Sequence, residues 1–136
     1  MVKKYEVGFV CGAFDLIHPG YVLLFQESKE ICNFLIVALH EDPSLERDNK
    51  RRPIHTVEER KLILSSIKYI NRIEVYKTED ELYYLLQRIS PDVRIQGEDY
   101  KQKRFTGDDL GIPTYYCKRE HTYSNTSLRK KIMVSS

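Results

Sequence analysis

The chain has 136 residues, which is enough for one domain, residues 1–136, around one hydrophobic core. Apolar residues make up 41% of it and charged residues 31%, as is ordinary for a globular protein. The formal net charge of +2 is too small to indicate a nucleic-acid partner. No apolar run is long enough to span a membrane, and the N-terminus lacks the apolar stretch of a signal peptide.

Five short β-branched or aromatic runs predict strands, at residues 7–11, 34–39, 73–76, 93–96 and 114–117. Helical patterns alternate with them, at residues 19–32, 57–69, 79–89 and 125–133. Two of these helices begin with capping-box spacing, and one begins with a proline. The alternation predicts an α/β fold, a Rossmann-like parallel five-stranded sheet with helices on both faces. Such sheets bind ligands at the carboxyl ends of their strands.

The three cysteines, Cys11, Cys32 and Cys117, are odd in number, share no metal-ligand spacing and lie in apolar runs. This pattern favours buried thiols in a reducing compartment over a disulfide framework. We therefore expect a cytoplasmic protein. No cluster of histidine, cysteine and carboxylate residues in the sequence indicates a metal site built by the protein.

The segment GAFDLIHPGY, residues 12–21, follows the first predicted strand and leads into the first predicted helix. Free N–H groups and the dipole at that helix start favour an anion, and Gly20 would let it approach closely. His18 could donate a hydrogen bond to a phosphate oxygen. The structural alternative is a capped turn in which His18 and Asp15 only satisfy backbone groups.

This segment resembles the GxFDxxHxGH signature of the cytidylyltransferase-like nucleotidyltransferases. The stretches HTVEERKLILSSIKYI, IQGEDY and REHTYSNTSLRKKI are also similar, and the resemblance runs from Val7 to Ile132. Within the family the sequence is most similar to bacterial glycerol-3-phosphate cytidylyltransferases. The resemblance implies that a phosphorylated alcohol, by default glycerol 3-phosphate, attacks the α-phosphorus of CTP and releases pyrophosphate. It also implies a Mg²⁺ ion carried with the triphosphate, and a homodimer.

Two departures from the family leave other functions open. Tyr21 stands where the signature has its second histidine, and a tyrosine cannot supply positive charge near pH 7. Loss of one charge-assisted contact costs about 1–3 kcal/mol, or roughly 10–100-fold in rate. The chain has no tryptophan, and Leu82 falls near an acceptor-binding lysine of the glycerol-3-phosphate enzymes. The alternatives are adenylyl transfer from ATP to a sugar phosphate or similar acceptor, and nucleotide binding with weak or no turnover.

The resemblance also implies roles for particular residues. His18, Tyr21 and Arg119 are the catalytic candidates. The basic loop RDNKRRP, residues 47–53, is either a solvated charged loop or a phosphate-binding loop, with Lys50 and Arg51 as contacts. Arg60 and Lys68 are acceptor-binding candidates, or else surface ion-pair partners of nearby glutamates. The nucleotide-binding candidates are Ala13, Phe14, Gly20, Lys50, Arg51, Gly97, Glu98, Asp99, Tyr123, Ser124, Asn125 and Thr126.

Two of these groups have a structural alternative. Glu98 and Asp99 could accept hydrogen bonds from a ligand, or they could simply form a turn after the fourth strand. The residues from Ser124 onward could form a second anion site at a helix start, or only an N-cap. Thr122 replaces a glycine of the family, and His121 is either a phosphate contact or a surface residue. Residues 101–111 read as an exposed connection.

Overall fold

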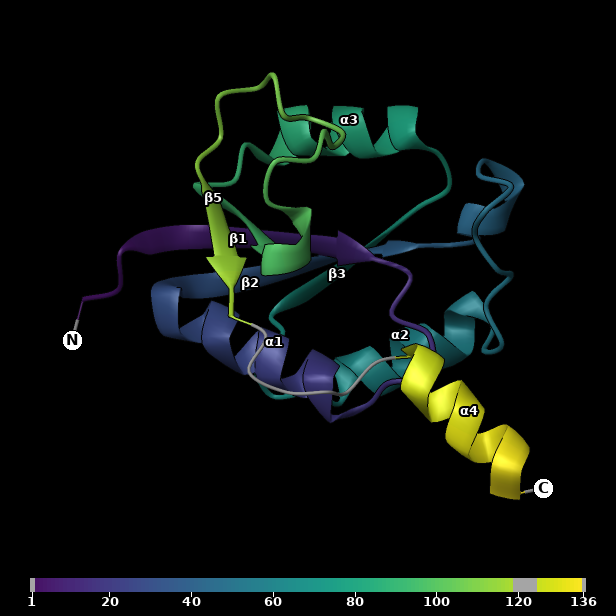
Figure 1. Cartoon of the computed structure of the whole chain (residues 1–136). Coiled ribbons are helices and arrows are strands. Elements are labelled where there is room, and N and C mark those ends of the chain that lie inside the picture. The colour runs from purple at the N-terminus through teal and green to yellow at the C-terminus, as the bar shows by residue number, and fades with distance from the viewer. Residues whose placement is uncertain (1, 119–124, 136) are drawn as a thin grey trace.

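The computed structural model describes the backbone of residues 2–118 and 125–135. Its centre is a sheet of five parallel strands in the order β3-β2-β1-β4-β5 (Figure 1). The strands are β1 (Tyr5–Gly12), β2 (Cys32–His40), β3 (Arg72–Tyr76), β4 (Val93–Gly97) and β5 (Thr114–Cys117). The predicted α/β fold with a parallel five-stranded sheet is therefore confirmed.

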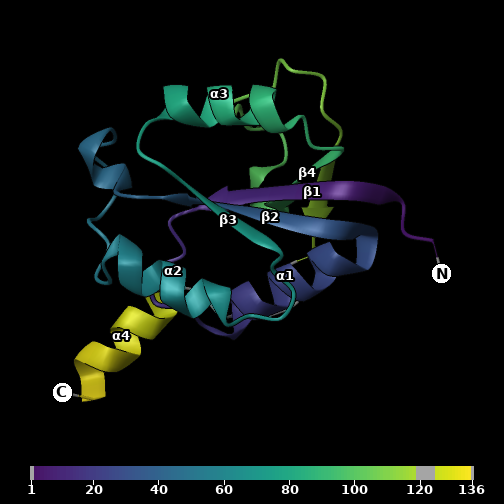
Figure 2. The ribbon, with the colours of Figure 1, turned by 180° about the vertical axis from the view of Figure 1, so that it is seen from behind.

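Helices cover both faces of this sheet. Helices α1 (Pro19–Ile31) and α2 (Val57–Ser65) lie on one face and α3 (Glu79–Ile89) lies on the other (Figures 1 and 2). Helix α4 (Asn125–Ser135) extends away from the sheet on the side of α1 and α2 (Figure 1). No helix among the described residues is both long and apolar enough to cross a membrane.

Side chains alternate along β1 between two hydrophobic clusters, as the two-residue period of a strand requires. Val10 belongs to the cluster under α1 and α2, which also contains Phe25 and Leu64. Phe9 belongs to the cluster under α3, together with Leu86. The sheet is thus buried on both faces, as expected for parallel strands joined by helical crossovers.

The observed helix starts agree closely with those predicted from the sequence, but one observed helix end differs from its prediction. Both predicted capping boxes are present, with Thr56 capping α2 and Thr78 capping α3. The prediction that the second helix runs to residue 69 is wrong, because α2 ends at Ser65. Residues 66–71 turn instead, which lets Ile67 and Ile70 pack onto the core cluster below α1 and α2.

The strand order reverses beside β1, where β2 lies on one side and β4 on the other. Such a topological switch point leaves a crevice outside the carboxyl ends of the two diverging strands, and ligands of open α/β sheets bind there. The segment after β1 and the segment after β4 both open into this crevice, so the fold brings two of the predicted site segments together.

Candidate functional site

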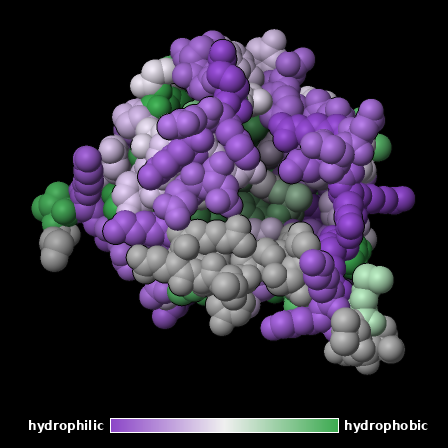
Figure 3. All heavy atoms as spheres, viewed as in Figure 1, coloured by the Kyte–Doolittle hydropathy of each residue, from purple (hydrophilic) through white to green (hydrophobic). Residues whose placement is uncertain are grey.

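A pocket of about 560 Å³ lies at the switch point. It is lined by the ends of β1 and β4, the starts of α1 and α3, the basic loop 47–53, the connection 101–111 and α4. On the face drawn in Figure 3 most side chains are hydrophilic, and apolar residues show in a recess near the centre. The size is that of a site for a small ligand.

Basic side chains outnumber carboxylates around this pocket. Its lining contains six arginine or lysine residues, Arg47, Lys50, Arg51, Arg94, Arg104 and Arg129. The two carboxylates that line it are each ion-paired, Asp15 with Arg129 at 2.9 Å and Glu79 with Arg47 at 2.9 Å. The residues that line the pocket therefore carry a net positive charge, which favours an anionic ligand.

Residues 12–21 form the wall nearest α1. Ala13 and Phe14 both line the pocket, and their predicted contact with a nucleotide stays a prediction. Phe14 is only 4% exposed and packs its ring against Tyr21 and Phe25. It has a φ of 48°, a left-handed conformation that is uncommon outside glycine and that the surrounding contacts hold in place.

His18 adopts the capped turn that was the structural alternative. It is the N-cap of α1, and its Nδ1 accepts a hydrogen bond of 3.1 Å from the N–H of Gly20. The next N–H groups, of Tyr21 and Val22, donate to the His18 carbonyl. The expectation of free N–H groups at this helix start is therefore wrong, because local contacts use them and Pro19 has none.

The capping contact also fixes the chemistry of the His18 ring. Because Nδ1 accepts this hydrogen bond, Nε2 is the ring nitrogen that could donate to a ligand. Neither His18 nor Gly20 is among the residues that line the pocket, although Tyr21 beside them is. The Tyr21 ring stacks on the imidazole at 4.2 Å between centroids. A phosphate-binding role for His18 stays a prediction.

Asp15 connects three parts of the pocket wall. It is 4% exposed, and its carboxylate accepts hydrogen bonds from the N–H groups of Ile54 at 2.8 Å and His55 at 3.0 Å. The same carboxylate pairs with Arg129 of α4. Asp15 therefore fastens the end of the basic loop and α4 to the segment after β1, and its oxygens are already used.

The basic loop is fastened at both ends and presents its middle residues to the pocket. Arg47 pairs with Glu79 at one end, and Asp15 holds the residues after the loop at the other. Lys50 and Arg51 line the pocket and are exposed. Neither has an ion-pair partner among the residues that the structure describes, which leaves their charge available to a ligand.

The interpretation of Arg60 as an acceptor contact or surface ion-pair partner is wrong. Its side chain is 1% exposed, and its guanidinium donates to the carbonyls of Ala13, His40, Glu41 and His55. Arg60 therefore holds α2 against the ends of β1 and β2. It is not among the pocket-lining residues.

The placement of Lys68 beside Arg60 on one helix is also wrong. Lys68 follows the end of α2, is exposed and lies 5.3 Å from the centroid of the Tyr69 ring. It is absent from the pocket lining, as Arg60 is. The two candidate acceptor contacts therefore do not meet at this pocket.

The segment after β4 contributes a glycine and a tyrosine to the lining of the pocket. Gly97 lines the pocket, and a Cβ atom added there would meet nothing within 4 Å. Glu98 and Asp99 belong to a short 3-10 helix, Glu98–Tyr100, and do not line the pocket, whereas Tyr100 does. The turn that was the alternative for Glu98 and Asp99 is therefore present.

Some predicted residues lie outside the described part of the chain. They are Arg119, His121, Thr122, Tyr123 and Ser124, and the side chains of Asn125 and Thr126. Their roles stay predictions. Helix α4 does lie beside the pocket, because Arg129 lines it and pairs with Asp15.

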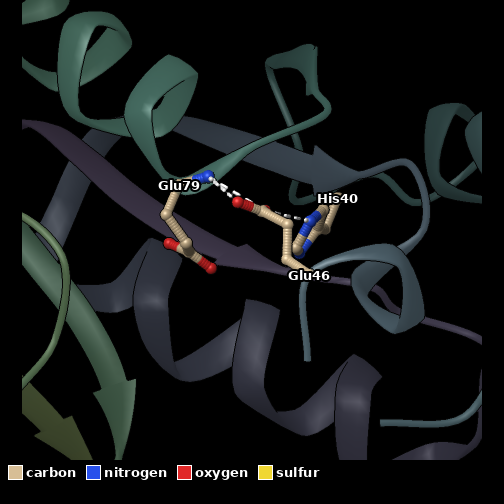
Figure 4. Close-up of side chains that lie close together, drawn as sticks. All are labelled: His40, Glu46 and Glu79. Carbon is tan, nitrogen blue, oxygen red and sulfur yellow. Dashed lines mark hydrogen bonds and ion pairs between the residues drawn. The ribbon is translucent and has the colours of Figure 1, made fainter. Parts of the chain in front are cut away.

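No pattern in the sequence indicates a metal-ligand cluster, yet the fold brings one together. Ligand atoms of His40, Glu46 and Glu79 all lie within 4.8 Å of one another (Figure 4). The residues come from β2, the loop after it and the start of α3, so no local spacing could reveal them. The expectation from the sequence, that the protein does not build a metal site, stays a prediction.

These three side chains are engaged with other groups. Nε2 of His40 is 3.2 Å from the carbonyl of Lys77, and the Glu46 carboxylate accepts the N–H of Glu79. The Glu79 carboxylate accepts hydrogen bonds from Arg47 and from the Thr106 hydroxyl. The cluster fastens the start of α3 to neighbouring loops, and we assign no metal to it.

Several pocket residues were not predicted. The connection 101–111 folds over the pocket and adds Arg104, Phe105 and Thr106. Cys11 lines the pocket, and burial raises the pKa of its thiol, so it is neutral near pH 7. Arg94 also lines it, and a charged residue inside the buried run VRIQG was the one signal that could have identified it.

The parallel sheet and the basic pocket at its switch point define an α/β domain with a ligand-sized, positively charged cavity. Residues 9–129 match the family model of the cytidylyltransferase-like proteins, and the chain belongs to this family. It is therefore a nucleotidyltransferase-family domain.

The chain is similar to proteins named bifunctional protein HldE. That of Helicobacter pylori (strain ATCC 700392 / 26695) is 32% identical over 132 residues, which cover 96% of this chain and 28% of the relative. That of Wolinella succinogenes is 37% identical over 106 residues, which cover 77% and 22%. The chain thus spans about a quarter of the length of these curated relatives.

Solved structures support the fold. The lipopolysaccharide core biosynthesis protein from Thermoplasma volcanium GSS1 has a TM-score of 0.67 and 24% identity, covering 88% of this chain and 99% of that one. Pantothenate synthetase from Thermus thermophilus has a TM-score of 0.60 and 16% identity, covering 96% and 66%. At these identities the likeness shows the fold alone.

Proposed function

We propose that this domain transfers a nucleotidyl group from a nucleoside triphosphate to a small phosphorylated alcohol and releases pyrophosphate. Membership of the cytidylyltransferase-like family supports the reaction class. The observation that carries the proposal is the pocket at the switch point, which Lys50 and Arg51 line without carboxylate partners among the described residues. A triphosphate is the kind of polyanion that such a site attracts.

In the proposed reaction an oxygen of the acceptor's phosphate attacks the α-phosphorus, and the bond from that phosphorus to the bridging oxygen of pyrophosphate breaks. This chemistry depends on positioning and on charge neutralisation rather than on a nucleophilic side chain. Lys50 and Arg51 would bind the triphosphate oxygens. Nε2–H of His18 would donate to the leaving phosphates once they reach the start of α1. The neutral thiol of Cys11 is not suited to act as a nucleophile.

A Mg²⁺ ion would enter with the triphosphate and take most of its ligands from phosphate oxygens and water. The Asp15 carboxylate does not fit as its ligand, because both oxygens already accept hydrogen bonds. Asp15 would instead position the end of the basic loop and α4 around the pocket, because it binds both of them.

CTP and ATP are the two donors to compare. The resemblance of the sequence to glycerol-3-phosphate cytidylyltransferases favours CTP and glycerol 3-phosphate. The similar curated proteins described above, however, are HldE proteins. They give glycerol 3-phosphate no special support, and ATP with a sugar phosphate is the second candidate pair. Both candidates use the same pocket and the same attack on the α-phosphorus.

A pyrophosphate-release assay tests the proposal. The chain is incubated with Mg²⁺, each of CTP and ATP, and a panel of glycerol 3-phosphate and sugar phosphates. We expect release with one donor and acceptor pair, and an increase of about 10–100-fold in nucleotide KM for Lys50→Ala combined with Arg51→Ala. Lys61→Ala, which removes an exposed lysine of α2, is the control. Nucleotide binding without pyrophosphate release from any pair would contradict the proposal and favour a binding protein.

A further inference from the structure

The wall of the pocket below α3 contains charged and polar groups that nucleotide binding at the basic loop does not use. Cys11, Arg94 and Gln96 line this wall from β1 and β4, and Tyr100, Phe105 and Thr106 complete it. We call these six residues the α3-side wall. Arg94 and Gln96 are two apart on β4, so they share one face of the sheet at a spacing of about 7 Å.

Arg94 is buried and its hydrogen-bonding capacity is only partly used. It is 1% exposed, and its guanidinium lies 5.8 Å from the centroid of Phe9 and 5.0 Å from that of Phe105. One terminal nitrogen donates to the Thr106 carbonyl and the other makes a long contact of 3.6 Å with the sulfur of Cys11. Its Nε–H is buried without a partner. Two aromatic rings therefore lie near the guanidinium, and its Nε–H is the donor left for an acceptor atom.

The charge of Arg94 also lacks a counter-ion. No carboxylate of the described residues lies within ion-pairing distance of it, and nearby Glu79 is paired with Arg47. Burial raises the pKa of the Cys11 thiol, so no thiolate balances the charge at neutral pH. A buried, unpaired cation is costly for a folded protein. Groups of this kind that line a pocket are therefore candidates for binding an anionic ligand.

Arg60 supplies an internal comparison, because it is equally buried. Its Nε and both terminal nitrogens donate to four backbone carbonyls, and it does not line the pocket. Burial alone therefore does not distinguish the two arginines. Arg94 differs because it has an unsatisfied N–H donor and lines a ligand-sized pocket. The hydrogen bonds of Arg60 instead hold α2 against the ends of β1 and β2.

Gln96 adds an unsatisfied acceptor to the same wall. Its Oε1 is buried and has no hydrogen-bond partner. A ligand that matches the α3-side wall therefore needs an anionic group for Arg94 and a hydroxyl that can donate to Gln96. A phosphate monoester of a polyol carries both groups on one small molecule.

We propose that Arg94 is a specificity-determining residue that binds the phosphate of a polyol phosphate acceptor, while Gln96 accepts a hydrogen bond from a hydroxyl of the same molecule. That this ligand is the acceptor, rather than another metabolite, rests on the proposed function. The α3-side wall and residues 13–15 belong to one pocket, so a phosphate bound at Arg94 shares the cavity with the triphosphate.

The test compares Arg94→Leu with Arg88→Leu, which removes an equal charge from an exposed arginine of α3. Inorganic phosphate is titrated by calorimetry into the free protein and into protein saturated with MgCTP or MgATP. We expect Arg94→Leu to weaken phosphate binding at least about 10-fold and to leave Tm unchanged or higher, because an unpaired buried charge is removed. Arg88→Leu is expected to bind phosphate as the wild type does.

Kinetics provide the second readout. Arg94→Leu should raise the acceptor KM at least about 10-fold and leave the nucleotide KM within about twofold. Gln96→Leu, which keeps Arg94, should weaken glycerol 3-phosphate binding but not inorganic phosphate binding. Either of two results would overturn the inference. The first is wild-type phosphate affinity in Arg94→Leu. The second is loss of folding in Arg94→Leu together with wild-type glycerol 3-phosphate affinity in Gln96→Leu. Arg94-dependent phosphate binding without pyrophosphate release would contradict the proposed function and leave the anion site standing.

Discussion

Replacement of Asp15 by alanine tests the carboxylate that fastens the pocket together. The carboxylate accepts two backbone N–H groups at 2.8 and 3.0 Å and pairs with Arg129 at 2.9 Å, while only 4% of the residue is exposed. Removal of one member of a buried, hydrogen-bonded pair costs about 3–5 kcal/mol. That is a large part of the roughly 5–15 kcal/mol that stabilises a typical domain.

For a chain of this length, 1 kcal/mol corresponds to about 3–5 °C in Tm, so Asp15→Ala should lower Tm by about 10–20 °C. Thermal and urea unfolding measure the change. Arg129→Met should cost less, because 20% of the Arg129 side chain is exposed and water can solvate part of its charge. The double variant should cost less than the sum of the two single variants, since both remove the same pair.

Asp92→Ala is the matched control. Asp92 also accepts a backbone N–H, that of Val7 at 2.8 Å, but it is exposed, so the expected cost is about 1 kcal/mol. Asp15→Ala should also raise the nucleotide KM, because the end of the basic loop loses its fastening. A Tm within about 3 °C of the wild type, or strict additivity with Arg129→Met, would refute the role assigned to Asp15.

Other substitutions give equally direct outcomes. His18→Asn keeps an N-cap acceptor but lacks Nε2–H, so it should fold normally and lose at least about 100-fold in turnover; near-normal turnover would exclude a phosphate role. Tyr21→His should keep or raise turnover, whereas an unfolded variant would assign Tyr21 to the core. Arg60→Leu should lower Tm by at least about 10 °C, and a stable variant with a raised acceptor KM would restore its predicted binding role. Because burial raises the pKa of Cys11, its alkylation should stay slow at pH 8 and accelerate only above pH 9; rapid reaction at pH 7 would contradict this.

The sequence allowed the fold to be predicted because local patterns and tertiary structure agree. Each predicted strand is a short apolar or aromatic run, and each is a strand of the sheet, with buried runs in the central strands β1, β2 and β4. The capping boxes at Thr56 and Thr78 defined helix starts to the residue. The end of α2 could not be predicted, because Ile67 and Ile70 continue the apolar pattern while the chain turns to bury them.

The site was predictable only where a segment has its own motif. Residues 12–21 and the basic loop were recognised from such motifs, and part of each segment lines the pocket. The burial of Arg60 depends on four carbonyls from segments distant in sequence, which no local pattern encodes. The connection 101–111 contains polar residues typical of a solvated loop, so its packing over Arg94 could be seen only in the fold.

A crystal structure with CTP or ATP bound tests the central claim most directly. We expect an ordered triphosphate in the pocket at the switch point. Its oxygens should contact Lys50 and Arg51, and its three phosphate groups should lie along residues 13–18. A nucleotide bound elsewhere on the molecule, with Lys50 and Arg51 directed to solvent, would contradict the claim.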